Sequence, residues 1–251
     1  PPRRSPGSST AASIMSINWC APLGRDVGVI VVAAGRGARM GGEVPKQYLT
    51  LAGHPVLLHA LRPFVSHPEV ATVVVVLPPA DAEAPPPWLA GLVGDALMIV
   101  AGGADRAASV RNGLAAVPAE CTVVLVHDGA RPFPPRAAID GGIQAARAGH
   151  AALPALPVSD TLKRADDFGR VLGTVPREGL WRAQTPQAFP RAMLERAHAA
   201  EMAGDIVATD DAMLAELLGA VVEILPGTAR NLKITTRDDL ALAEWYAAES
   251  G

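Results

Sequence analysis

The chain has 251 residues, enough for one large α/β domain with a sizeable core. Apolar residues make up 49% of it, which excludes a disordered chain, and the net charge of −3 argues against bulk electrostatic binding of nucleic acid. No apolar run approaches the length needed to span a membrane. Cys20 and Cys121 form neither a disulfide framework nor a metal-ligand spacing, so we expect a reducing, cytoplasmic setting.

Residues 1–26 differ in composition from the rest and are predicted to be a disordered tail. The first ten residues are rich in proline, serine and arginine, a composition that buries too little apolar surface to fold. Residues 11–19 are too short and too polar a stretch for a signal peptide. Residues 27–251 are predicted to form a single domain.

The most informative stretch is an apolar run followed by a glycine-rich loop. Residues 29–34 include no polar side chain and are rich in β-branched residues, which predicts a strand buried on both faces. The loop carries four glycines, Gly35, Gly37, Gly41 and Gly42, and two cations, Arg39 and Lys46. Free backbone N–H groups and fixed positive charges suit a polyphosphate. A flexible loop with ordinary surface charges remains the alternative.

Two well-known phosphate-binding loops do not fit this stretch. The dinucleotide fingerprint needs a third glycine where the chain has Met40, and an acid after the next strand, where the chain has Pro78. The P-loop needs Gly-Lys-Ser/Thr, whereas Gly42 is followed by Glu43. Both patterns therefore fail, and what remains is Ala-Ala-Gly-x-Gly-x-Arg-Met followed by Lys-Gln-Tyr.

Strands and helices alternate through the next hundred residues. The sequence predicts a helix over 54–66, a strand over 72–77, a variable crossover over 81–94, a strand over 97–100, a helix over 106–117, a strand over 123–126, a helix over 135–148 and a strand over 151–155. This order implies a mostly parallel sheet with helices on both faces. Ligands of such sheets lie beyond the carboxyl ends of the strands. Gly35, Gly102 and Asp128 all follow strands and should share that edge.

The pattern breaks at residues 157–181, which read as a β-hairpin with little local core. A two-stranded hairpin is marginal in water, so this arm is expected to need a partner surface. Beyond it, helices are predicted over 191–203, over 210–218 with Thr209 as N-cap, and over 236–248 with Thr236 as N-cap. A strand is predicted over 221–225, and Lys233 is placed in a further strand. In the last helix, Leu240, Leu242, Trp245 and Tyr246 are expected mainly on the core side.

Further motifs follow the glycine-rich loop in order. They are Gly102-Gly103-x-x-Arg106-x-x-Ser109, His127-Asp128-x-Ala130-Arg131-Pro132, Asp160-Thr161-Leu162-Lys163-Arg164, Arg177-x-Gly179-Leu180-Trp181 with Thr185-Pro186-Gln187, Thr209-Asp210-Asp211 and Asn231-x-Lys233. Over residues 27–248 the chain resembles the 2-C-methyl-D-erythritol 4-phosphate cytidylyltransferase family of the non-mevalonate isoprenoid pathway. The resemblance implies a Rossmann-like fold of the nucleotide-diphospho-sugar transferase type, with the hairpin arm building a homodimer.

The resemblance also implies roles for individual residues. Arg39 and Lys46 would be catalytic, stabilising the pentacoordinate state at the attacked phosphorus. CTP would be bound by Ala33, Ala34, Gly35, Gly37, Gly102, Arg106, Ser109 and Asp128. The phosphorylated polyol would be bound by Arg131, Thr161, Arg177, Thr185 and Lys233, with Arg177 serving the neighbouring subunit. A divalent cation, Mg²⁺, would bind Asp128, because a carboxylate at a strand end can hold a metal that bridges phosphates.

Several of these residues have plainer interpretations. Asp128 could instead cap the turn before Pro132, and His127 is interpreted as structural. Asp210 and Asp211 could form a second acid site, but we favour an acidic helix start, which the helix dipole stabilises. The family usually carries Asp at the position of Ala104, with Asp105 beside it, and Ala at the position of Gly129. The first departure leaves one base or ribose contact open, and the second should preserve access.

The sequence therefore predicts an enzyme that transfers CMP from CTP to 2-C-methyl-D-erythritol 4-phosphate and releases pyrophosphate. Three alternatives remain open: a ribitol-5-phosphate cytidylyltransferase, a nucleotidyltransferase acting on another sugar phosphate, and a nucleotide-sensing module without turnover. Neither nucleic acid nor a membrane is expected as a partner.

Overall fold

The computed structural model describes residues 25–35, 44–94, 96–204 and 208–249. The predicted tail up to residue 24, Gly37 and Arg39 lie outside the described residues. Asp26, at the end of the predicted tail, accepts a hydrogen bond of 2.7 Å from the Thr122 hydroxyl and forms an ion pair of 2.5 Å with Arg147.

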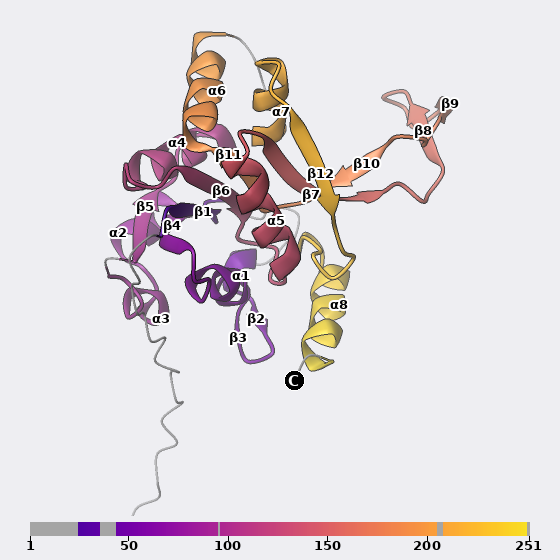
Figure 1. Ribbon diagram of the computed structural model, residues 1–251. Coiled ribbons are helices and arrows are strands. Elements are labelled where there is room, and N and C mark those ends of the chain that lie inside the picture. Colours follow the sequence, from indigo (N-terminus) through magenta and orange to yellow (C-terminus); the bar gives the residue numbers. More distant parts are fainter. Residues whose placement is uncertain (1–24, 36–43, 95, 205–207, 250–251) are drawn as a thin grey trace, which may run out of the picture.

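An eight-stranded sheet runs through the protein (Figure 1). Its parallel strands lie in the order β6 (Val123–Asp128), β1 (Val27–Val32), β4 (Val70–Leu77) and β5 (Leu97–Ala101). Between β6 and β7 (Ala151–Pro157), β11 (Gln187–Pro190) runs antiparallel to both. Two further strands, β10 (Trp181–Ala183) and β12 (Val222–Pro226), pair with β7. The sheet is mostly parallel, as predicted.

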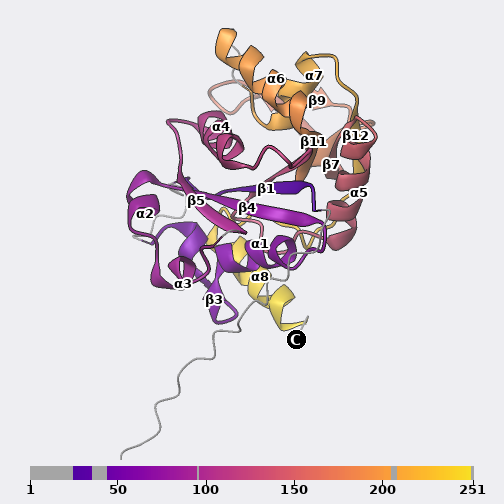
Figure 2. The same cartoon turned by 60° about the vertical axis from the view of Figure 1, so that its left-hand side comes forward.

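Helices cover both faces of this sheet, as the alternation of elements predicted. On one face, Val29 and Val31 of β1 pack in one cluster with α1 (Val56–Val65) and α5 (Arg136–Arg147). On the other face, Ile30 packs with α4 (Arg106–Ala116), α6 (Arg191–Ala203) and α7 (Asp211–Leu217). Figure 2 shows α4, α6 and α7 on one side of β1 and β4, and α1 on the other. Burial on two faces explains why β1 has no polar residue.

Short elements connect this framework. They are the 3₁₀-helix η2 (Lys46–Tyr48), β2 (Thr50–Leu51), β3 (His54–Pro55), α2 (Pro79–Glu83) and α3 (Pro87–Ala90). The last helix is α8 (Arg237–Ala248). The predicted cap of α8 is present, with Asp239 N–H donating to the Thr236 hydroxyl at 3.2 Å. None of the helices in the described part of the chain is long and apolar enough to cross a membrane.

The predicted hairpin is formed by β8 (Leu162–Ala165) and β9 (Val171–Val175), which pair with each other and form a separate two-stranded sheet. It projects from the body as an arm (Figure 1). Its turn holds Phe168, whose surface is 84% exposed, and Leu172 on β9 is also exposed. The prediction of a hairpin with little core of its own is confirmed.

Some local predictions were wrong. Lys233 lies in an extended segment outside any strand, because Ile234 N–H makes one bond to Ala130 O at 2.8 Å and no ladder follows. Asp210, rather than Thr209, caps α7 by accepting a hydrogen bond from Met213 N–H at 3.0 Å. On α8, Leu242 and Trp245 are largely exposed, since the buried stripe of that helix is narrow and centres on Ala243.

Candidate active site

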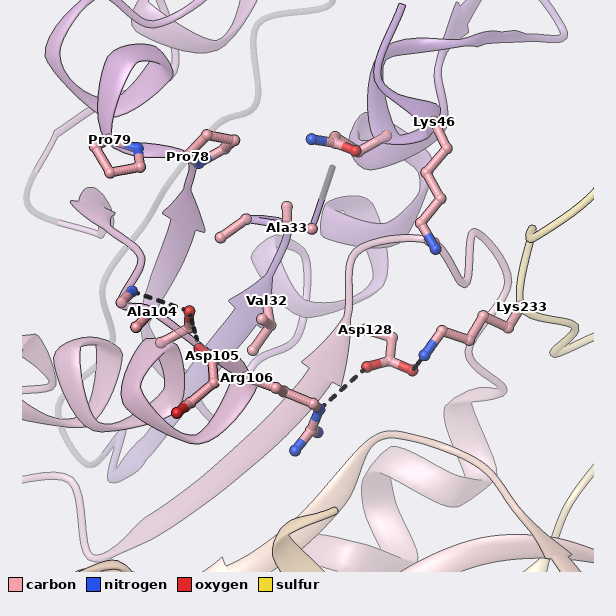
Figure 3. Close-up of a pocket in the computed structure, with 16 residues that line it drawn as sticks. Val32, Ala33, Lys46, Pro78, Pro79, Ala104, Asp105, Arg106, Asp128 and Lys233 are labelled. Carbon is pink, nitrogen blue, oxygen red and sulfur yellow. Dashed lines mark hydrogen bonds and ion pairs between the residues drawn. The ribbon is translucent and has the colours of Figure 1, made fainter. Parts of the chain in front are cut away.

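A cavity of about 560 Å³ opens at the carboxyl edge of the parallel strands. Its walls come from the end of β1, the loop between β5 and α4, and Asp128 at the end of β6, with Lys46 and Lys233 reaching in from two loops (Figure 3). The prediction that these three strand ends share one edge is therefore confirmed. Ala33, Ala34 and Gly35 line the cavity directly, as do Arg106 and Ser109.

The loop between β5 and α4 is held tightly in place. Gly103 N–H donates to the Ser109 hydroxyl at 3.1 Å, and that hydroxyl donates to Asp105 O at 2.8 Å. A Cβ on Gly102 would lie 2.5 Å from the Ala34 Cβ, so only glycine lets this loop approach the end of β1. Asp105 caps α4 by accepting a hydrogen bond from Ala108 N–H at 2.6 Å. Ser109 thus fixes the loop from within as well as lining the cavity.

Gly129 also keeps two strand ends close together. A Cβ on this residue would lie 2.9 Å from the Ala33 Cβ and 3.1 Å from Leu57 Cδ1. Alanine at this position would require a shift of the neighbouring β1 loop. The glycine therefore allows the ends of β1 and β6 to pack closely at the edge of the cavity.

Three cations surround the Asp128 carboxylate. Lys233 Nζ lies 2.9 Å from Oδ2, Arg131 Nε lies 3.5 Å from Oδ2, and Arg106 Nε lies 3.8 Å from Oδ1. Burial raises the pKa of Asp128, but the Lys233 ammonium and the Arg106 and Arg131 guanidinium groups outweigh it and hold that pKa well below its ordinary value. Asp128 is therefore ionised at neutral pH. Asp128 therefore does more than cap a turn, although its backbone O does accept a hydrogen bond from Arg131 N–H at 3.0 Å.

His127 points away from the cavity into the core, where its side chain is fully buried. Its Nε2 lies 3.0 Å from Arg131 O, which can only accept, so Nε2 carries the proton. Nδ1 then accepts from the Thr185 hydroxyl at 2.9 Å, and the same hydroxyl accepts from Asp128 N–H at 3.1 Å. Burial lowers the pKa of His127 to about 4, which keeps it neutral. Both residues brace the end of β6, and Thr185 is only 4% exposed.

Arg131 is likewise built into the body. Its Nη1 donates to Asn231 O at 2.7 Å, and Asn231 Nδ2 donates to Thr185 O at 2.8 Å. Gln184 Nε2 donates to Thr228 O at 2.9 Å, so this network ties the segment before Lys233 to the segment after β10. Asn231 belongs to a motif noted in the sequence but was given no role there, and Gln184 was not singled out, because a buried amide has no distinctive spacing.

Lys46 stands on the opposite wall from Asp105, at the start of η2 (Figure 3). The position of η2 is set by Gln47, which is buried, and by Tyr48, whose hydroxyl donates to Asp81 at 2.7 Å. Burial and the Asp81 carboxylate raise the pKa of Tyr48, so it stays a donor. Asp81 belongs to α2, in the crossover that had been predicted to be variable surface.

The arm residues lie apart from the cavity. Thr161 and Arg177 are exposed, and neither lines the cavity of the same chain. Arg177 Nη1 donates to Ser159 O within the arm. Of the five residues predicted to bind the acceptor, the described structure brings only Arg131, Thr185 and Lys233 around Asp128.

A second charged cluster lies at the opposite, amino-terminal end of the strands. His67, Glu69 and Asp140 offer three ligand atoms within 4.8 Å of one another. His67 Nδ1 accepts Glu69 N–H at 3.2 Å, so its other nitrogen keeps the proton and donates to Asp140 at 2.8 Å. Arg136 and Arg147 neutralise the two carboxylates. This arrangement joins α1, β4 and α5 and is structural rather than metal-binding.

The cavity thus combines cations, an ionised carboxylate and a wall shaped by glycine, which suits a nucleotide whose phosphates reach Lys46 and Arg106. The family model described as 2-C-methyl-D-erythritol 4-phosphate cytidylyltransferase matches residues 27–249. Proteins of that name from Salinibacter ruber and Pelotomaculum thermopropionicum are each 46% identical to the chain, over 86% and 87% of its length and 90% and 92% of theirs.

Solved structures agree with these relatives. The cytidylyltransferase of the same name from Thermus thermophilus superposes with a TM-score of 0.73 and 37% identity, covering 87% of this chain and 98% of that one. The 4-diphosphocytidyl-2C-methyl-D-erythritol synthase of Anaerococcus prevotii gives a TM-score of 0.76 with 29% identity, covering 90% and 99%.

Proposed function

This chain belongs to the 2-C-methyl-D-erythritol 4-phosphate cytidylyltransferase family, and on that premise we propose how its residues perform the reaction. The enzyme transfers CMP from CTP to 2-C-methyl-D-erythritol 4-phosphate, giving 4-diphosphocytidyl-2-C-methyl-D-erythritol and pyrophosphate. An oxygen of the acceptor phosphate attacks the α-phosphorus of CTP, and pyrophosphate leaves. Negative charge gathers on the α-phosphoryl oxygens, so the protein must orient two anions and stabilise that charge.

The observation that carries the assignment of roles is the convergence of Lys46, Arg106, Lys233 and Asp128 on one cavity. Lys46, together with Arg39 of the preceding loop, stabilises the charge of the transition state. The loop from Gly102 to Ser109 holds the nucleoside against the end of β1, and Arg106 contacts the phosphates. Lys233 and Arg131 attract the acceptor phosphate, with Thr185 acting through Asp128 and His127 rather than by direct contact.

Asp128 is the residue that would hold Mg²⁺. Its carboxylate is ionised, supplies the hard oxygen atoms that this ion prefers, and lies at the edge of the cavity. The ion would neutralise the triphosphate and favour departure of pyrophosphate.

The remaining acceptor ligands, Thr161 and Arg177, come from the arm of a second copy of the chain. Support comes from their distance from the cavity of their own chain and from the exposed Phe168 and Leu172, which gain burial in a homodimer. A reducing, cytoplasmic setting is supported by Cys121, a buried free thiol.

A pyrophosphate-release assay with a panel of substrates tests this function. We expect release with CTP and 2-C-methyl-D-erythritol 4-phosphate, and little with ribitol 5-phosphate or with UTP, GTP or dTTP. Lys46→Ala and Arg39→Ala should each lower kcat by a factor on the order of 10² to 10³ while the protein stays folded. The matched control is Lys163→Ala, whose ammonium group donates to the Thr174 hydroxyl on the arm. Full activity of Lys46→Ala and Arg39→Ala, or a preference for another nucleotide or polyol, would contradict the assignment.

A further inference from the structure

A row of charged and polar side chains leads from the cavity into the packing of α6 and α7. Arg106 Nη1 lies 2.7 Å from Asp211 Oδ2, closer than the 3.8 Å that separates Arg106 Nε from Asp128 Oδ1. Asp211 Oδ1 in turn lies 3.1 Å from His198 Nε2. His198 Nδ1 lies 3.4 Å from Glu201, and Glu201 pairs with Arg111 at 2.5 Å. The row therefore connects a cavity residue on α4 to residues on α6 and α7.

Asp211 lies in the first turn of α7, as the predicted acidic helix start requires, but its side chain does not cap the helix. That role belongs to Asp210, whose side chain accepts from Met213 N–H, while the Asp211 side chain is only 1% exposed and turns toward α4 and α6. Burial raises the pKa of Asp211, but His198 and Arg106 outweigh it and lower the pKa, so the group is ionised. A buried carboxylate is costly unless it is paired, so this one stays charged because two partners hold it.

Asp211 and Asp128 both attract the guanidinium of Arg106. Arg106 begins α4 and has a side chain that is 30% exposed to the cavity. Asp211 Oδ2 pairs with Nη1, and Asp128 attracts Nε from the cavity side (Figure 3). Without Asp211, Asp128 would be the nearest remaining acid, and the guanidinium would shift onto it. Asp211 therefore keeps Arg106 in place and leaves Asp128 less occupied.

We propose that Asp211, held by His198, is a positioning residue that sets Arg106 for the phosphates of CTP, acting through Arg106 and never touching the substrate itself. The inference rests on the proposed function, since it assigns Arg106 to the nucleotide. It predicts an effect on CTP that is separate from any effect on the acceptor, because the acceptor side is formed by Lys233, Arg131 and the arm.

A double-mutant cycle with Arg106→Ala and Asp211→Asn tests the proposal. CTP affinity is measured by titration calorimetry, and kcat and both KM values by pyrophosphate release. Asp211→Asn should raise the KM and Kd for CTP about tenfold and leave the acceptor KM within about twofold, and in the Arg106→Ala background it should change CTP binding by less than about twofold. Glu216→Gln, an exposed residue of the same helix, is the matched control. Equal effects of Asp211→Asn in both backgrounds, or equal changes in both KM values, would overturn the proposal.

His198→Gln provides a second entry to the same cycle if Asp211→Asn fails to fold. It removes one partner of Asp211 while leaving both acids intact, so it should weaken CTP binding about threefold in the presence of Arg106 and not in its absence. The same weakening in both backgrounds would count against the proposal. If the wild-type protein binds CTP but releases no pyrophosphate, the proposed function fails, and the binding cycle still decides the role of Asp211.

Discussion

The cavity and the β8–β9 arm are the two regions expected to meet substrates, and they satisfy their side chains in different ways. In the cavity, every partner of Asp128 comes from the same chain, and His127, Thr185 and Asn231 form a buried polar network beneath it. In the arm, Phe168 and Leu172 are exposed, and the strands pair only with each other. The comparison shows that the polar side chains around Asp128 are paired within one chain, whereas the arm leaves apolar side chains exposed.

The largest expected effect is at the centre of the cavity. Asp128→Asn removes the charge that three cations share, so kcat should fall about 100-fold or more, and the crowded cations should lower the unfolding midpoint as well. Asp140→Asn is the control, because it weakens an ion cluster at the other end of the sheet. It should affect stability but not kcat. Loss of stability without loss of turnover at Asp128 would mean that this carboxylate is only structural.

A substitution in the arm should instead raise the acceptor KM without lowering stability. Arg177→Ala should raise the acceptor KM by about tenfold or more, the loss expected when a charged hydrogen bond to phosphate worth about 1.5–3 kcal/mol is removed. The CTP KM and the unfolding midpoint should hardly change, because Arg177 is exposed and its intrachain bond is to Ser159 O. Isothermal titration with each substrate measures the separation. An equal loss of affinity for both substrates would remove the distinction between the two regions.

Acid should lower the stability of the folded domain through His127. Its pKa is about 4 in the folded protein and about 6.5 in an unfolded chain. Between these values the unfolded state binds the proton and the folded state does not, so stability is complete above pH 6.5 and falls as pH drops toward 4, by up to about 3 kcal/mol. Urea unfolding from pH 7 to 4 measures how the free energy of unfolding depends on pH. The slope of this dependence should be shallower in His127→Gln than in the wild type and unchanged in the control His54→Gln, whose side chain is exposed. Identical slopes would exclude His127 as the source.

The smallest effect is expected at the support of η2. Tyr48→Phe removes the hydrogen bond to Asp81 and should lower the free energy of unfolding by about 1 kcal/mol. Because Lys46 begins the same short helix, kcat should fall a few-fold, as expected for a slight misplacement of a catalytic group. Chemical denaturation and steady-state kinetics check both values. A stability loss with unchanged kcat would show that η2 holds Lys46 without this bond.

Sequence reasoning gave the parallel strands and the helices on both faces because these follow from hydrophobic runs and their spacing. It also placed Gly35, Gly102 and Asp128 at one edge, since chain direction decides which strand ends meet. It did not find β10 and β11, because Trp181–Pro190 is short and broken by Pro186, and it placed Lys233 wrongly in a strand. Antiparallel pairing between strands this far apart in the chain, such as Trp181 with Pro157 or Gln187 with Val126, is not visible in the local pattern.

The candidate site residues also divide into those that the sequence predicted and those that it did not. Lys46, Arg106 and Lys233 could be predicted because the motifs that carry them resemble those of the family, and all three line the cavity. Asp211 could not be separated from Asp210, since both look like an acidic helix start until burial distinguishes them. Thr185 was expected to bind the acceptor, but its hydroxyl is buried against His127 and the Asp128 backbone, because a hydroxyl in a motif does not reveal which way it faces.

Mixing two impaired variants, assayed at an acceptor concentration well below the wild-type KM, tests the complementary roles of cavity and arm most directly. A dimer of Lys46→Ala with Arg177→Ala would contain one site with an intact body and an intact neighbouring arm. Co-refolded in equal amounts, the two variants should recover about a quarter of the wild-type rate, because random pairing leaves one intact site in four. Pyrophosphate release no greater than the mean of the two variants alone would contradict an arm that serves the neighbouring cavity.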